Sequence, residues 1–228
     1  MTDTFYIGAY WYQRKQLLDE IIEPSIATLK GLQEFDDQFG NLYELGRSRK
    51  HALERKISIT PEYIRKLYLK NVKKNDLDVS GYNTIGFRLS AWTGHQDYES
   101  SKISLNVGIN SEKFVNRCLI SIPSEGIARG RLLQIKKVKQ IFDLIIEIWN
   151  PDYAVLTSRD LLEALDIMNE VGWVTYVKKL WRKPKISTKV LHEHDYLGGH
   201  LFYLNTTDDQ AYDYSLINEL LPLKNVLS

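Results

Sequence analysis

Strict alternation of apolar and polar residues through the centre of the chain is the feature that most constrains its fold. Three segments place an apolar side chain at every second position: Ile85–Ala91, Ile103–Ile109 and Cys118–Ile122. Successive side chains of a β-strand point to opposite faces, so each segment has one apolar face and one polar face. This pattern is typical of an antiparallel sheet that is covered on one side only.

Helical spacing appears on both sides of this central region. Apolar residues recur three and four positions apart between Leu18 and Leu32, and Pro24 inside that stretch is expected to kink the helix or divide it. Thr60, Pro61 and Glu62 combine a capping residue, a proline at the first helical position and an early acid, which predicts a helix start. The segment Arg131–Trp149 is apolar over much of its circumference, which predicts a largely buried helix against the sheet.

These patterns together predict an α+β fold, a mostly antiparallel sheet packed against several helices. Further strands are expected at Phe5–Trp11, Tyr153–Leu156, Trp173–Val177, Lys189–Asp195 and His200–Asn205. The Gly198–Gly199 pair between the last two suits a tight hairpin, and a terminal helix is expected from Asp208 or Asp209 to Leu220. A chain of 228 residues can bury one sizeable core, so we expect one domain over residues 1–228.

The amino-acid composition limits which kinds of protein this chain is expected to be. The net charge is +1, from 30 basic and 29 acidic residues, whereas a nucleic-acid binder usually shows a basic excess. The one cysteine, Cys118, allows no internal disulfide, which is consistent with a reducing compartment. The start of the sequence lacks the pattern of a signal peptide, and no apolar run reaches the roughly 20 residues that span a bilayer. We therefore expect a cytoplasmic protein without a membrane partner.

Three histidines form the best candidate for a metal site. His192 and His194 are two residues apart in a predicted strand, and His200 lies across the hairpin, so their imidazoles could converge. Local spacing is only part of what zinc requires, so we expect a polar strand without a metal here and keep a metal-dependent enzyme as the alternative. Cys118 lies in an apolar strand, which favours an inert thiol. The sequence has no serine-hydrolase motif, phosphate loop or zinc-protease motif, so we expect no enzyme and no cofactor.

Two basic clusters are the candidates for nucleic-acid binding. They are Arg47–Lys50 and the segment Lys178–Lys185, which contains Trp181 as a possible stacking residue. The second cluster supports a small RNA-binding module as an alternative function. A solvated turn beside Pro184 explains it as well, and the balanced net charge favours the turn.

Aromatic and charged residues near predicted strand ends are the candidates for binding a protein partner. Tyr12 and Arg14 follow the first strand, and Asp97, Tyr98 and Glu99 lie in the loop after the strand that ends near Trp92. Trp11 and Trp92 themselves are expected in the core. Further acidic candidates are Glu34, Asp36 and Asp37, with Asp208 and Asp209 near the end of the chain.

Several short segments, in a preserved order over most of the chain, resemble the immunity protein 52 family of bacterial polymorphic toxin systems. They include Phe5–Trp11, Tyr43–Glu44, Gly46–Lys50, Gly86–Phe87, Leu89–Ser90, Trp92, Gly94, Trp149, Pro151–Asp152, Thr157–Ser158, Gly172–Trp173, Thr175–Tyr176 and Gly198–Gly199. The resemblance weakens between Asn71 and Asn83 and after Lys178. Where the family has Trp-Asn-Gly, this chain has Trp92-Thr93-Gly94.

The resemblance implies a protein that binds and inhibits a cognate toxin without performing chemistry. The family association suggests that this toxin is a nuclease of restriction-endonuclease fold. An interface of about 1,600 Å² with a few aromatic and charged anchors can give such a complex high affinity. Nuclease inhibitors often present an acidic surface to the basic cleft of the nuclease. Because the charges of this chain are balanced, such an acidic surface has to be a local patch.

Overall fold

The computed structural model describes residues 3–166, 171–205 and 212–225. The chain divides into two compact units, residues 10–120 and residues 1–9 with 121–228, and the boundaries fall within strands β1 and β5. Both units combine helices with mostly antiparallel strands, so the predicted α+β class is confirmed. Within the described ranges, no helix combines the length and the apolar character needed to cross a bilayer.

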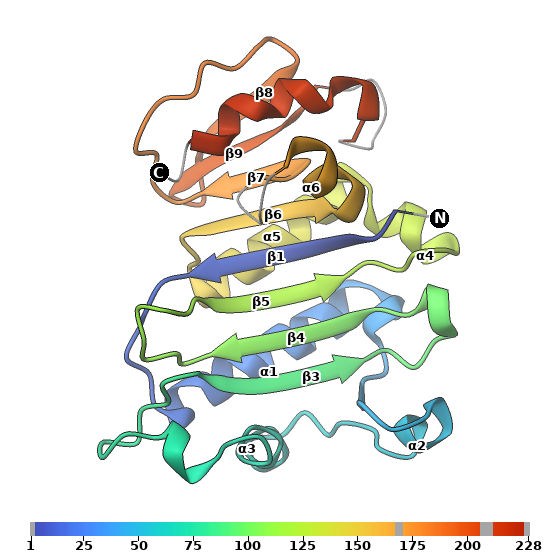
Figure 1. The fold of residues 1–228 in the computed structure, drawn as a ribbon. Helices are drawn as coiled ribbons and strands as arrows, with labels where there is room; N and C mark the ends of the chain where they lie inside the picture. Colours follow the sequence, from blue (N-terminus) through green and yellow to red (C-terminus); the bar gives the residue numbers. More distant parts are fainter. Residues whose placement is uncertain (1–2, 167–170, 206–211, 226–228) are drawn as a thin grey trace. The chain divides into compact units, whose positions relative to one another are not determined.

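The unit of residues 10–120 is built on the strands that the alternating pattern predicts. Its strands follow the order β2-β3-β4-β5, and each adjacent pair is antiparallel. Strands β3, β4 and β5 lie side by side in Figure 1. The register places Leu89 opposite Leu105, and Leu105 opposite Cys118, so the apolar positions form a continuous row on one face. The elements are α1 (Leu18–Phe35), η1 (Asp37–Phe39), β2 (Tyr43–Glu44), α2 (Arg49–Leu53), α3 (Pro61–Leu69), η2 (Lys74–Asp76), β3 (Phe87–Trp92), η3 (Asp97–Glu99), β4 (Lys102–Val107) and β5 (Asn116–Ser121), where η marks a 3₁₀ helix.

Helices α1 and α3 provide the apolar cover for this unit, and α1 lies behind β3 and β4 in Figure 1. The hydroxyl groups of Ser25 in α1 and Tyr68 in α3 lie 2.6 Å apart, and the Tyr68 ring meets the edge of Phe87 in β3. Thr60 caps α3 as predicted, because its side chain accepts a hydrogen bond from the amide of Tyr63. The expectation that Pro24 divides the first helix is wrong, since α1 runs unbroken through it.

The other unit carries strands in the order β1-β6-β7-β9-β8. Phe142 and Trp149 of α5 are buried, as predicted for the covering helix. That helix begins at Ile135 rather than Arg131, which belongs to the short preceding helix α4. The elements are β1 (Phe5–Trp11), α4 (Ile127–Leu132), α5 (Ile135–Trp149), β6 (Tyr153–Ser158), α6 (Arg159–Leu165), β7 (Val174–Val177), β8 (Val190–Tyr196), β9 (Gly199–Leu204) and η4 (Tyr214–Asn225).

Strands β8 and β9 form the predicted hairpin. Asp195, Leu197 and Gly198 in its turn have positive φ angles, a conformation that glycine adopts without strain. The register shifts between His194 and Tyr196 at this end of the ladder. The expected start of the terminal helix at Asp208 or Asp209 lies outside the described residues; the structure instead has η4, which continues past Leu220.

The sequence predicts a single domain over residues 1–228. This prediction means that the two compact units should unfold together. Each unit has its own set of buried apolar residues, with Leu29, Leu89 and Leu105 in one and Phe142 and Phe202 in the other. The single domain therefore stays a prediction, which a thermal unfolding curve with one transition supports and two separate transitions contradict.

Candidate functional site

The loop that connects β3 to β4 is held rigidly at its base. The amide of Thr93 donates to the carbonyl of Ser101 (3.1 Å), and the amide of Ser101 donates to the Thr93 hydroxyl (2.9 Å). Within the loop, the Ser100 hydroxyl donates to the carbonyl of His95 (2.7 Å). These bonds hold the short 3₁₀ helix η3 at the end of the sheet.

The three side chains of η3 point into solvent. Tyr98 is 67% exposed, and Asp97 and Glu99 are also exposed. Among the described residues, none makes a hydrogen bond or ion pair with either carboxylate or with the Tyr98 phenol. An exposed tyrosine between two unpaired acids therefore remains available to a partner, and aromatic residues are frequent at the centres of interfaces.

A second acidic segment lies beside η3, although it is about 60 residues away in the sequence. The Gln38 side chain in η1 donates to the Glu99 carbonyl (2.8 Å) and to the Ser101 hydroxyl (3.3 Å). Glu34, near the end of α1, and Asp37, in η1, are both exposed. We name Glu34, Asp37, Asp97 and Glu99, together with Tyr98, the acidic end of the unit.

Asp36 belongs to the same segment, but its position differs from that of its acidic neighbours. It is 8% exposed, and its carboxylate accepts a hydrogen bond from the amide of Gln38 (3.0 Å). This contact caps η1 and so holds Gln38 where it contacts the Glu99 loop. Asp36 therefore supports the acidic end from within and is not part of its surface.

Tyr12 and Arg14, the other predicted contact residues, lie at the opposite end of the strands. The Asn116 side chain, at the start of β5, donates to the Tyr12 carbonyl (3.1 Å), whereas η3 follows the last residue of β3. Tyr12 is 59% exposed, and the Arg14 guanidinium lies 5.7 Å from the centre of the Trp11 ring. Strand β3, with 6 residues, spans about 20 Å. The Tyr12–Arg14 pair and the η3 residues therefore form separate sites.

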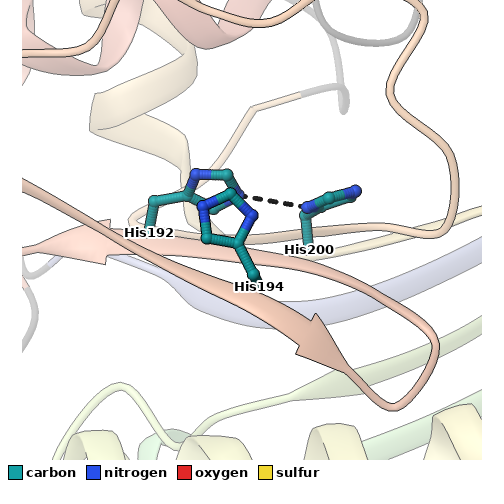
Figure 2. Close-up of side chains that lie close together, drawn as sticks. All are labelled: His192, His194 and His200. Carbon is teal, nitrogen blue, oxygen red and sulfur yellow. Dashed lines mark hydrogen bonds between the residues drawn. The ribbon is translucent and has the colours of Figure 1, made fainter.

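The structure brings the three predicted histidines of the β8–β9 hairpin together (Figure 2). His194 pairs directly with His200, and Nε2 of His192 lies 3.2 Å from Nδ1 of His200. Partial burial lowers the pKa of His192 to about 4, and nearby His194, His200 and Lys183 act in the same direction. At neutral pH this imidazole is therefore uncharged, and one of its two ring nitrogens carries a lone pair.

Two other candidates from the sequence have ordinary surroundings. Cys118 is fully buried in β5, as predicted, and burial raises the pKa of its thiol to about 12, which disfavours the reactive thiolate. In the basic segment, Trp181 is 66% exposed, and the Lys179 ammonium lies 4.8 Å from its ring centre. That contact is a local cation–π pair, which a solvated turn accommodates as readily as an RNA-binding surface does.

Comparison with known proteins decides the family. The profile of the family described as "Immunity protein 52" matches residues 3–207, nearly the whole chain. This chain belongs to the immunity protein 52 family. Its fold is similar to that of the Pseudomonas aeruginosa T6SS protein PA0821, with a TM-score of 0.50 and 10% sequence identity over 98% of this chain and 73% of that one. A comparison with curated proteins found no match.

Several positions that carry the immunity protein 52 resemblance have a packing role in the structure. A Cβ atom on Gly94 would lie 2.6 Å from the Tyr43 ring, and one on Gly172 would lie 2.2 Å from the carbonyl oxygen of Leu156. Neither position accepts a side chain without movement of its neighbours. The resemblance at these two positions is therefore explained by how the elements pack.

A charged groove is the surface feature that reading the sequence missed. It has a volume of about 460 Å³ beside β3, and Glu44 of β2 is one of the residues that line it. The Glu44 carboxylate contacts the Arg55 guanidinium, the Lys70 ammonium (3.0 Å) and the Tyr63 hydroxyl (2.9 Å). Glu44 belongs to one of the segments that carry the family resemblance. Its three partners, however, lie 11 to 26 positions further along the chain, so no local sequence pattern indicates these contacts.

Proposed function

We propose that this immunity protein 52 member protects its cell by binding a cognate toxin, a nuclease, through the acidic end of residues 10–120. Family membership supports a toxin as the partner. The nuclease class comes from the family association and the chemistry of the surface. The observation that carries the proposal is the contact of the Gln38 side chain with Glu99 and Ser101, which joins the acidic segment of η1 to the loop that contains η3.

The acidic end fits the basic cleft that a nuclease needs to bind phosphates. Asp97, Glu99, Glu34 and Asp37 are exposed, and their carboxylates are not neutralised by described residues of this chain. Four such charges attract a basic partner over a distance near the Debye length, about 8 Å at physiological salt, and so speed association. Tyr98, which is 67% exposed between Asp97 and Glu99, then supplies apolar contact area.

The Tyr12–Arg14 corner is a second candidate for the same function. It offers an exposed tyrosine and a cationic side chain, which suits a partner surface with acidic residues. We place the main contact at the acidic end because a basic cleft is the feature that nucleases share. Inhibition requires only that the cleft is occupied, so the protein need not be an enzyme and needs no cofactor. A toxin that attacks nucleic acid acts in the cytoplasm, which is where we propose that the inhibitor works.

Co-expression tests this proposal. Cells that carry the cognate toxin, to be sought in the neighbouring open reading frame, should survive when the protein is present, and the two chains should co-purify as a complex. The control is co-expression with an unrelated soluble protein at the same level. Cell death at comparable soluble levels of the immunity protein contradicts the protective function. Protection against a toxin without nuclease activity contradicts the nuclease assignment alone.

A further inference from the structure

The β8–β9 hairpin places three imidazoles on one face of two paired strands. His192 and His194 are two residues apart in β8 and share a face, and His194 lies opposite His200 in β9. His192 lies opposite Phe202 on the same face, and the two rings stack with centres 4.1 Å apart and planes 16° apart. Phe202 is fully buried, so it fixes the His192 ring from the inner side.

The spacing of the imidazole nitrogens is close to that of a transition-metal site. One ring nitrogen from each histidine lies within 4.8 Å of the others, and the shortest pair, His192 Nε2 and His200 Nδ1, is 3.2 Å apart. Nitrogen ligands at about 2.0–2.1 Å in a tetrahedral zinc site are about 3.3 Å from one another. Figure 2 shows His194 beside this pair, and its side chain is exposed, so its ring is free to adjust its rotamer when an ion binds.

Glu193, the carboxylate between the two histidines of β8, does not lie on the face that carries the three histidines. Glu193 points to the other side of the strand, where its carboxylate accepts hydrogen bonds from the Lys139 ammonium (2.7 and 2.8 Å) and the Tyr203 hydroxyl (2.6 Å). On the histidine face the charged neighbour is Lys183, which cannot bind a cation. Among the described residues, the ligand set therefore consists of three imidazole nitrogen donors, a set that suits zinc, copper and nickel and does not suit magnesium or calcium.

We propose that His192, His194 and His200 bind one Zn²⁺ ion, with the fourth coordination position open to water or to a side chain of a binding partner. Three protein ligands with one open position is an arrangement that zinc adopts in proteins. The ion links β8 to β9 across the hairpin, and a metal that binds only the folded chain stabilises it. This site does not depend on the toxin-binding function proposed above.

Titration calorimetry of tag-free protein with Zn²⁺ at pH 7.5 tests the site. We expect one ion per chain and a higher melting temperature in the presence of Zn²⁺, with no such effect of Mg²⁺. The variant His194→Ala should bind Zn²⁺ more than about 100-fold more weakly, since removing even an indirect supporting residue of a metal site costs 10–100-fold. His194 is exposed, so this variant should keep the melting temperature of the metal-free protein.

The chain provides a matched control in His51, an exposed histidine of the other unit. The variant His51→Ala should bind Zn²⁺ as the wild type does. Absorption of bound Co²⁺ in the visible range, present in the wild type and lost in His194→Ala, would show that nitrogen ligands hold the ion in a tetrahedral arrangement. Equal Zn²⁺ affinity of wild type and His194→Ala overturns the proposal. So does a stoichiometry of one ion per two chains, because the ion then bridges two copies rather than the hairpin.

Discussion

The groove and the acidic end of residues 10–120 both carry several charges, but they use them in different ways. In the groove, Glu44 is 14% exposed and is surrounded by the cations of Arg55 and Lys70. At the acidic end, the carboxylates of Asp97 and Glu99 have no such partner among the described residues. Charges that are paired within a fold help to hold it together, whereas unpaired charges that add nothing to the fold remain free to attract a partner.

Charge reversal at the acidic end should have the largest effect on binding. The double variant Asp97→Lys/Glu99→Lys places two cations opposite the basic cleft, and like-charge contacts in an interface cost several kcal/mol. We expect toxin affinity to fall at least about 100-fold, or about 2.7 kcal/mol, with a slower association rate. Stability should change by less than about 0.5 kcal/mol, because both residues are exposed and unpaired.

Surface plasmon resonance with the cognate toxin measures both rates, and urea unfolding measures stability. The matched control is Glu23→Lys/Glu112→Lys, which makes the same change in net charge at exposed positions away from the acidic end. If the control weakens binding as much as the Asp97 and Glu99 variant does, overall charge rather than this surface governs the complex. Unchanged affinity in both variants places the contact elsewhere.

Glu44→Ala should show the opposite pattern. Without the carboxylate, Arg55 and Lys70 face each other with no counter-charge, and the Tyr63 hydroxyl loses its acceptor. Removing one partner of a buried ion pair costs 3–5 kcal/mol, and for this partly exposed network we expect about 2 kcal/mol of lost stability. Toxin affinity, measured at a temperature where the variant is fully folded, should match the wild type.

Urea unfolding of Glu44→Ala and of the control Glu112→Ala measures this difference. Glu112 is exposed, so its replacement should change stability by less than about 0.5 kcal/mol. A stable Glu44→Ala protein that binds the toxin poorly would reverse the comparison and identify the groove as the contact surface.

The strands and buried helices could be predicted because periodicity reports burial directly. The alternation in β3, β4 and β5 gives their apolar faces, and the spacing of Phe142 and Trp149 gives the inner face of α5. The ends of helices are harder to predict from the sequence. The apolar spacing continues through the break between α4 and α5, so it does not show that α5 begins at Ile135. The unbroken α1 shows that packing of its buried face outweighs the local cost of Pro24.

The candidate site was predictable in its residue types but not in its arrangement. His192, His194 and His200 were found because period two and a tight turn place them on one face. The contact between Gln38 and the Glu99 loop joins residues 61 positions apart, and no local pattern encodes it. For the same reason the sequence could not show that Asp36 is buried while Asp37 is exposed, or that Tyr12 and Tyr98 lie at opposite ends of the strands.

Tyr98 and Tyr12 provide the smallest and most selective test of where the toxin binds. Both side chains are more than half exposed, so replacing either with alanine should leave stability nearly unchanged. If the acidic end is the centre of the interface, Tyr98→Ala should weaken toxin binding about tenfold through faster dissociation, because a central aromatic residue buries its ring against the partner. Tyr12→Ala, about 20 Å away along the strands, should change affinity less than twofold. The reverse result would move the contact to the Tyr12–Arg14 corner, and the effect of Asp97→Lys/Glu99→Lys would then have to come from long-range attraction. Repeating the measurement in 0.5 M salt separates these cases, since screening removes long-range attraction but leaves the loss of the Tyr98 ring contact in place.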